Sequence, residues 1–293
     1  MPILIRTLAL SDVPSAMELS TGAGWNQTAE DWRRIIQLSA NGCRCVEDAG
    51  KIVATITLLR YGTDLAWIGM VLTRPEYRRQ GLAKQLVEDA IAGAERDGIR
   101  TLKLDATDEG RPLYEGLGFA VEEAIERWGR KGRAIGAKGI SLAPKLEIRS
   151  GSLVGPMPDG LVALDTRAFG VPRKQLLEKL CASGRWDFTG NGYVLSRAGR
   201  TARCLGPCVA SSEEGARQLI ATHLGGFNCE GVEPEGPSSL NWYWDLLPKN
   251  SEAVSCAEDC GFTRRRILWR MRRGETITNN DAMIYANAGF ELG

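Results

Sequence analysis

The sequence predicts a mixed α/β protein in which one arrangement of strands and helices occurs twice in tandem. The order hairpin, loop, helix, strand and short helix can be followed in the first half of the chain and again in the second. In addition, TDEGRPLYEGLGF at 107–119 aligns without a gap with NSEAVSCAEDCGF at 250–262. An internal duplication explains both observations.

Composition restricts the class of protein. A chain of 293 residues is long enough for about two domains. The 37 basic and 36 acidic residues give a net charge of +1, which argues against a nucleic-acid-binding protein. No apolar run approaches the roughly 20 residues of a membrane span, and the first residues show no signal-peptide pattern. We therefore expect a cytoplasmic protein with no membrane or nucleic-acid partner.

The eight cysteines are expected to be reduced thiols in that compartment. The only histidine is His223, and no CxxC pair exists. Buried thiols are therefore favoured over a metal site.

Periodicity and capping residues predict the elements of the first half. Ser11 can cap a short helix, and Thr28 with Asp31 resembles a capping box that opens another. Alternating residues predict a hairpin of two strands about YGTD. The loop RPEYRRQG then leads to an amphipathic helix, a strand and a short helix through Tyr114. The corresponding ranges are 51–60 and 65–73 for the hairpin strands, 82–98 for the helix and 101–107 for the strand.

The second half repeats this order with different side chains. GYVLSR and TARCL form a hairpin about AG, GPCVASS is expected to be a loop, and LNWYWDLL alternates as a strand. A Gly-rich and basic stretch separates the halves. We predict a first domain over 1–130, a linker over 131–146, a second domain over 147–275 and a tail over 276–293 that docks on a domain surface.

The stretch RRQGLA, residues 78–83, carries the clearest chemistry. It lies between a predicted strand and the start of a predicted helix, where free backbone N–H groups bind phosphate. Gly81 allows close approach of a ligand, and Arg78 and Arg79 can add charge-assisted hydrogen bonds. Alone, the string is more typical of a solvated basic turn; the elements around it favour an anion site.

In this context the sequence resembles the GNAT family of acetyl-CoA-dependent N-acetyltransferases. RRQGLA matches the family's Q/R-x-x-G-x-G/A motif, and TDEGRPLYEGLGF matches its segment ending in L-Y-E-x-x-G-F. The resemblance is strong over residues 3–130 and holds only in outline over 146–273. AGWNQTAEDW and AWIGMVLTRPEYRR are further similar to the two-domain YitH-type subgroup, in which a degenerate domain follows a complete one. The resemblance implies tandem domains, each a mixed, mostly antiparallel sheet flanked by helices.

The resemblance also implies roles for individual residues. The pantetheine arm of acetyl-CoA would pair with the backbone of Val71, Leu72 and Thr73. The pyrophosphate would be held by Arg78, Arg79, Gln80, Gly81, Leu82 and Ala83. Tyr114 would assist the leaving thiolate. Thr107 stands where many members have Asn, which puts that cofactor contact in doubt.

The acceptor side is less defined. Trp25, Asn26 and Trp67 are candidates for lining the acceptor site, although Trp67 also fits a core position. In many relatives a Glu on the strand before the loop serves as the general base, whereas LAWIGM contains no Glu. Four carboxylates remain open as the base, as does a water chain: Glu30, Asp31, Asp64 and Asp105.

The second half lacks the phosphate loop and the phenol, because GPCVASS has no arginine and Ala257 aligns with Tyr114. We therefore expect one active site, in the first half, with the second half shaping access for an amine of a small molecule or peptide. The aromatic residues available for such a wall are Trp186, Trp242, Tyr243 and Trp244. The alternatives are a non-catalytic acetyl-CoA-binding sensor or interaction module, and a second half that binds a ligand of its own. The oligomeric state cannot be predicted.

Overall fold

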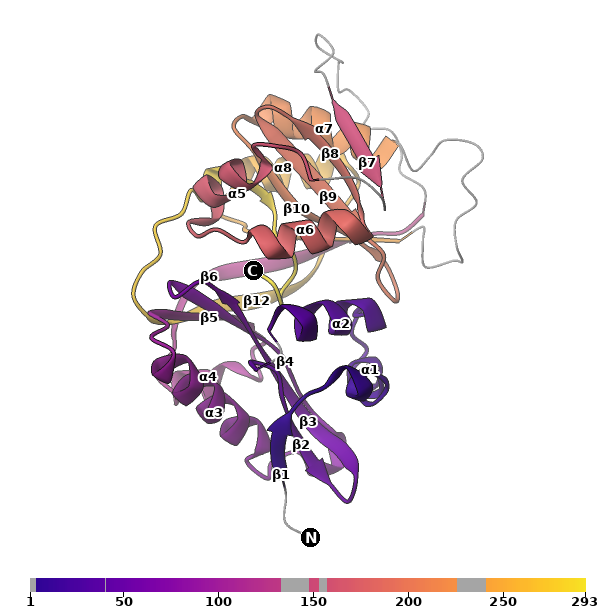
Figure 1. The fold of residues 1–293 in the computed structure, drawn as a ribbon. Helices are drawn as coiled ribbons and strands as arrows, with labels where there is room; N and C mark the ends of the chain where they lie inside the picture. The colour runs from indigo at the N-terminus through magenta and orange to yellow at the C-terminus, as the bar shows by residue number, and fades with distance from the viewer. Residues whose placement is uncertain (1–3, 40, 133–147, 153–156, 226–240) are drawn as a thin grey trace. The chain divides into compact units, whose positions relative to one another are not determined.

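The computed structural model describes residues 4–39, 41–132, 148–152, 157–225 and 241–293 (Figure 1). Backbone contacts divide the chain into two compact units. Unit 1 comprises Met1–Glu122, Trp269–Ile277 and Phe290–Gly293, and unit 2 comprises Glu123–Leu268 and Thr278–Gly289. Most of the predicted linker, residues 133–146, lies outside the described residues.

Unit 1 is built on a mostly antiparallel sheet with the strand order β1-β2-β3-β4-β5-β12. Only β4 and β5 run parallel; the other neighbouring pairs are antiparallel. The predicted hairpin is confirmed as β3 and β4, and the predicted strand after the helix as β5. The bounds are β1 Leu4–Thr7, β2 Arg44–Asp48, β3 Lys51–Tyr61, β4 Leu65–Thr73, β5 Thr101–Ala106 and β12 Thr263–Gly274.

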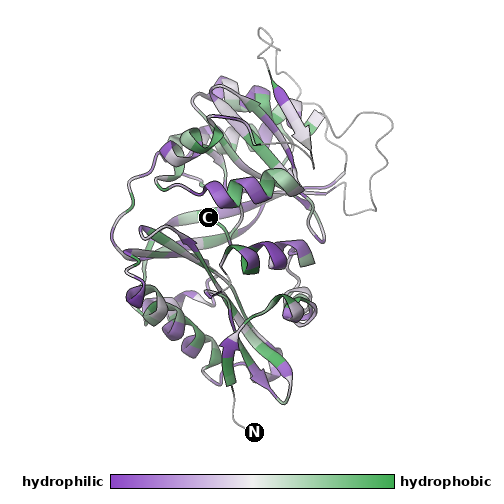
Figure 2. Cartoon of the chain, in the orientation of Figure 1, coloured by the Kyte–Doolittle hydropathy of each residue, from purple (hydrophilic) through white to green (hydrophobic). Residues whose placement is uncertain are grey.

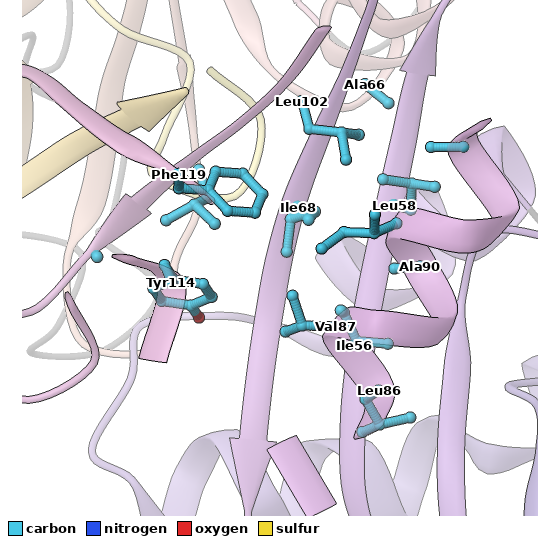
Figure 3. Packing of buried hydrophobic residues seen from close by; sticks show 14 of the residues in the cluster. Ile56, Leu58, Ala66, Ile68, Leu86, Val87, Ala90, Leu102, Tyr114 and Phe119 are labelled. Carbon is cyan, nitrogen blue, oxygen red and sulfur yellow. The ribbon is translucent and has the colours of Figure 1, made fainter. Parts of the chain in front are cut away.

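Helices cover both faces of this sheet. Helices α1 (Val13–Gly22) and α2 (Ala29–Leu38) lie on one face, and α3 (Leu82–Arg96) with α4 (Arg111–Glu115) lies on the other (Figure 1). The turns of α3 alternate between hydrophobic and hydrophilic colouring (Figure 2), as expected for a helix with one apolar face. That face packs on side chains of β3, β4 and β5 to form the core in Figure 3.

Helix starts show where local sequence predicts well and where it does not. At α2 the capping box is confirmed, because Thr28 Oγ1 accepts from Asp31 N–H at 3.2 Å and an Asp31 carboxylate oxygen accepts from Thr28 N–H at 2.9 Å. At α1 the prediction is wrong: Ser11 is not the cap. A short 3₁₀ turn over Leu10–Asp12 precedes the helix, and Asp12 holds the N-cap position.

Unit 2 repeats the arrangement around the strand order β6-β11-β10-β9-β8-β7. Strands β10 and β11 are parallel, and β13 adds an antiparallel partner to β10. The stretch GPCVASS was expected to be a loop, but Gly206–Ala210 continue β10 after an irregularity in register. The bounds are β6 Ala120–Arg130, β7 Arg149–Ser152, β8 Arg185–Thr189, β9 Gly192–Arg197, β10 Arg203–Ala210, β11 Trp242–Leu246, β13 Ile284–Ala286, α5 Leu161–Phe169, α6 Lys174–Ser183, α7 Glu213–Gly225 and α8 Ser251–Asp259.

The last strand of each repeat is divided between the units. Residues Glu126–Arg130 of β6 pair with β11 in unit 2, and Trp269–Gly274 of β12 pair with β5 in unit 1. These strands have 11 and 12 residues, about twice the usual length. The predicted boundaries place all of β6 in the first domain and all of β12 in the second, which is a different division. The tail is likewise shared, because β13 belongs to unit 2 and Phe290–Gly293 to unit 1.

Candidate active site

Strands β4 and β5 separate in the middle of the unit 1 sheet. They pair through Leu65–Thr101, Ala66–Leu102 and Trp67–Lys103, and no further. Beyond Trp67, no strand among the described residues pairs with β4 on that side. The backbone of Val71, Leu72 and Thr73 therefore has hydrogen-bonding groups available for an extended ligand.

A β-bulge accompanies the separation. Thr57 pairs with Gly69 but Thr55 pairs with Leu72, so β4 carries one extra residue at this point. Met70 adopts a φ of 50° there, and its carbonyl accepts a hydrogen bond from Thr55 Oγ1 at 2.9 Å. A non-glycine residue in this region costs about 1–2 kcal/mol. Met70 was not among the predicted site residues, because neither its residue type nor its position in the strand pattern indicates a bulge.

The loop before α3 has the geometry of an anion site. Arg79 and Gly81 have φ values of 64° and 81°, and Gly81 is the N-cap of α3. Residues 78–81 are exposed, and Arg78 N–H donates to Pro75 O at 3.2 Å within the loop. The N–H groups of residues 79–81 and the first N–H groups of α3 can therefore reach a ligand. Leu82 is buried in the core and fixes the helix start, whereas Ala83 is half-buried. Gln80 Nε2 donates to Glu76 O at 3.2 Å within the loop.

Tyr114 of α4 lies in the apolar core between the sheet of unit 1 and α3. It packs edge-on against Phe119, with ring centroids 6.0 Å apart, and belongs to the cluster that includes Ile68 (Figure 3). Burial raises the pKa of Tyr114 well above its ordinary value. The phenol is therefore protonated at neutral pH, which suits a hydrogen-bond or proton donor and not a base. Thr107 is exposed, and its Oγ1 accepts from Gly110 N–H at 3.1 Å at the start of α4.

The predicted acceptor residues differ in exposure. Trp25 is half-buried, and Asn26 beside it is buried. Trp67 is 1% exposed; its Nε1 donates to Phe290 O at 2.9 Å, and the Arg270 guanidinium lies 4.8 Å from its ring centroid. Trp67 thus supports the C-terminal segment, and its direct contact with an acceptor stays a prediction.

Each of the four carboxylates considered as a base has an arginine partner. Asp105 is paired with Arg270 at 2.9 Å in a buried position. Asp31 is paired with Arg34 at 2.6 Å, and also caps α2. The remaining pairs lie nearer the surface: Asp64 with Arg100, and Glu30 with Arg33 at 3.9 Å. None of these four carboxylates is singled out as the base by its contacts.

The equivalent region of unit 2 is occupied by the chain itself. Strands β10 and β11 pair only from Arg203–Trp242 to Leu205–Trp244. Beyond that point β13 pairs with β10 through Cys208–Ala286 and Val209–Ile284. Ala257, which aligns with Tyr114, is fully buried in the same apolar cluster as Tyr285 of β13.

The aromatic residues of unit 2 that were considered for a pocket wall are largely in its core. Trp186, Trp242 and Trp244 are buried, whereas Tyr243 is half-buried with Arg127 5.0 Å from its ring centroid. Within the described parts of the chain, no group of three His, Cys, Asp or Glu side chains is arranged to hold a metal ion. Nor does any helix described there have the length and apolar character to cross a membrane.

Comparison with known proteins identifies both halves. Residues 14–119 match the family model described as acetyltransferase (GNAT) family, and residues 161–286 match that described as acetyltransferase (GNAT) domain. The Bacillus subtilis protein YitH, described as an uncharacterized N-acetyltransferase, is 28% identical over 215 residues, covering 71% of this chain and 73% of YitH. A glucosamine 6-phosphate N-acetyltransferase of Trypanosoma brucei brucei is 32% identical over 85 residues, which are 27% of this chain and 58% of that protein.

Solved structures share the complete two-unit fold. A putative acetyltransferase from Pyrococcus horikoshii has a TM-score of 0.83 at 18% identity, covering 99% of this chain and 96% of that chain. A tandem GNAT protein from the clavulanic acid biosynthesis pathway has a TM-score of 0.65 at 15% identity, with 95% and 100% covered. The chain belongs to the GNAT acetyltransferase family as a tandem member of the N-acetyltransferase type, and it uses an acyl-CoA donor and an amine acceptor.

Proposed function

We propose that unit 1 transfers an acetyl group from acetyl-CoA directly to an amine of a small molecule or peptide. The observation that carries this proposal is the separation of β4 from β5 beyond Trp67. The exposed loop that begins α3 and the buried phenol of Tyr114 belong to the same unit and support it. These three features supply a backbone edge, an anion site and a proton donor within one unit.

The donor's parts correspond to these features. The pantetheine arm pairs with Val71–Thr73, and the pyrophosphate binds the loop of residues 78–83. A backbone N–H of β4 stabilises the negative charge that develops on the thioester oxygen. Tyr114 donates to the departing sulfur, which is already a tolerable leaving group because thiols have a pKa near 8.5.

Unit 2 is proposed to have no transfer site of its own. Its β13 occupies the backbone edge that the donor would use, and no arginine lies between Leu205 and α7. The part that the second half plays in acceptor access stays a prediction from the sequence.

The test is thiol release from acetyl-CoA across a panel of amines: amino acids, polyamines, aminoglycosides, peptides with free N-termini or lysines, and amino sugars. Glucosamine 6-phosphate belongs in the panel because one relative is named for it. We expect thiol release that depends on at least one amine. In Tyr114→Phe the rate of release should fall by up to about 100-fold, the lower end of the effects of general acid catalysis. Tyr77→Phe removes a phenol of the same unit, bonded to Asp48 at 2.8 Å, and is expected to leave release unchanged.

Two results would contradict the proposal. Tight acetyl-CoA binding with no release for any amine indicates the sensor. Equal release by wild type and Tyr114→Phe removes Tyr114 from the mechanism.

A further inference from the structure

Thr55 of β3 holds the bulge of β4 from the neighbouring strand. Its backbone pairs with Leu72, and its Oγ1 donates to Met70 O at 2.9 Å. Thr55 is 0% exposed, so this hydrogen bond is shielded from water. The extra residue of a bulge is left out of the strand ladder, and a buried carbonyl there needs another partner. The hydroxyl of Thr55 is that partner for Met70.

This hydrogen bond fixes the direction of the next N–H group. Met70 C=O and Val71 N–H belong to one planar trans peptide unit, so they point in opposite directions. With the carbonyl held toward Thr55, the Val71 N–H points away from β3. Strand β5 has separated from β4 by this point, because their last pair is Trp67 with Lys103. The Val71 N–H is therefore available to a ligand and not to a neighbouring strand.

A fixed direction matters for stabilising charge in the reaction. Negative charge develops on the thioester oxygen as an amine attacks, and a backbone N–H stabilises it best when its orientation is set beforehand. Met70 is buried with a φ of 50°, a conformation that a non-glycine residue keeps only where its surroundings hold it. The Thr55 hydroxyl holds the carbonyl side of the peptide unit whose N–H side faces away from β3.

We propose that Thr55 is a positioning residue for acetyl transfer: by binding the Met70 carbonyl, it directs the Val71 N–H at the thioester oxygen. This inference rests on the proposed function, in which a backbone N–H of β4 stabilises that oxygen. It assigns the N–H to Val71 and its orientation to a side chain of β3. Thr55 touches neither substrate and acts only through the peptide unit between Met70 and Val71.

The role of the Val71 N–H follows from the electron flow. The amine nitrogen forms a bond to the thioester carbon, and one electron pair of the C=O bond moves to oxygen, where the N–H stabilises it. The pair returns as the C–S bond breaks and the thiolate leaves. Nitrogen loses one proton and sulfur gains one, with Tyr114 as the donor to sulfur.

Thr57 offers a matched control two residues along β3. Ile56 and Leu58 lie in the α3 core (Figure 3), so Thr55 and Thr57 both point to the opposite face of the sheet. Both threonines are 0% exposed. Among the residues that the structure describes, however, Thr57 Oγ1 has no hydrogen-bond partner. Exchange of Thr for Val alters the same face by the same atoms at both positions, but releases the Met70 carbonyl only at Thr55.

The first measurement needs no acceptor. The infrared stretch of an isotopically labelled acetyl-CoA carbonyl, bound to the protein, reports the hydrogen bond to the thioester oxygen. We expect a narrow band in wild type and Thr57→Val, and a band that is split or shifted to higher frequency in Thr55→Val. Thr55→Ser restores the hydroxyl and should restore the wild-type band. CoA, which lacks the thioester oxygen, should bind all four proteins with the same Kd.

The second measurement uses an amine that wild type acetylates. Loss of an oxyanion donor costs about 100- to 1000-fold in kcat, but Thr55→Val keeps the Val71 N–H and frees only its direction, so we expect a smaller fall of about 10-fold. Both kcat and kcat/KM should fall by this factor, because the lost interaction is made in the transition state. Thr57→Val should keep the wild-type kcat, and Thr55→Ser should recover most of it.

Thr55→Ala takes the place of Thr55→Val if the latter does not fold. A wild-type carbonyl band or a wild-type kcat in the variant without the hydroxyl overturns this inference and leaves the proposed function standing. Equal losses in Thr55→Val and Thr57→Val also overturn it, because they assign the effect to packing of β3. Absence of wild-type transfer to every amine overturns both the inference and the proposed function.

Discussion

Gly69 and Glu291 lie in direct contact in unit 1. A Cβ on residue 69 would meet Cα and Cβ of Glu291 at 3.0 Å and its carbonyl oxygen at 3.1 Å. Because these are mainly backbone atoms of a segment held by Tyr61 and Trp67, they have little freedom to move aside. The missing side chain on β4 is therefore the feature that lets the C-terminal segment bring a carboxylate to Gln27.

Gly69→Ala should displace this segment. Overpacking of a fixed contact costs about 1–3 kcal/mol in the free energy of unfolding, measurable by urea denaturation. Gly93→Ala is the control: it lies inside α3, its added Cβ comes no nearer than 3.6 Å to Arg96 Nη2, and it should gain up to about 1 kcal/mol of stability. Equal stability of Gly69→Ala and wild type would show that the C-terminal segment shifts to accept the added Cβ at little cost in free energy.

Arg78 and Arg79 are expected to contribute to donor binding and not to folding. Both are exposed, and their proposed partner is the pyrophosphate. Hydrogen bonds to charged groups contribute about 1.5–3 kcal/mol, so the double variant Arg78→Gln, Arg79→Gln should raise the KM for acetyl-CoA about 10-fold or more. Its melting temperature should match wild type, and Arg33→Gln on α2 serves as an exposed control. An unchanged KM would leave donor binding to the backbone N–H groups alone.

Much of unit 1 could be predicted because its elements are specified by local sequence. The capping box at Thr28 and the apolar stripe of α3 depend on residues within one or two turns of each other. The same is true of the hairpin between β3 and β4. Their recovery from the sequence follows from this short range, and so does the recognition of the loop before α3.

The features that were not predicted depend on contacts between distant residues. Nothing in the sequence of β12 shows that its second half pairs with β5, because strand periodicity specifies a face and not a partner. The bulge at Met70 is a property of register. Likewise, Glu291 appears in the sequence as one more tail residue, and only the folded chain brings it to Gln27. Gly206 and Pro207 suggested a loop, although both lie within β10.

The filling of unit 2 by β13 predicts one donor site per chain. Isothermal titration calorimetry with CoA should give a stoichiometry of one for wild type. Ala257→Tyr should not add a second site, because the backbone edge of β10 remains paired at Cys208 and Val209 and no arginine precedes α7. Two equivalents of CoA bound by wild type would contradict this reading of unit 2.

His223 of unit 2 should make stability depend on pH. Its ring is fully buried, with Nδ1 2.5 Å from Asp187 Oδ2 and Nε2 2.8 Å from Ser196 Oγ. Burial lowers the pKa of His223, although the hydrogen bond and charge of Asp187 oppose that shift. The unfolded chain therefore binds a proton near pH 6.5 that the folded chain does not, and stability is lost as pH falls below that value.

The expected loss is at most about 1.4 kcal/mol per pH unit, until the pKa of the folded state is reached. Because His223 is the only histidine, and unfolded carboxylates titrate below about pH 5, urea denaturation between pH 7.5 and 5.5 isolates its contribution. His223→Gln should be less stable throughout, since its amide cannot reproduce both hydrogen bonds, but its stability should be flat across this range. The same slope in His223→Gln as in wild type would assign the pH dependence to other groups. A slope of opposite sign in wild type would mean that Asp187 holds the imidazole in its protonated form.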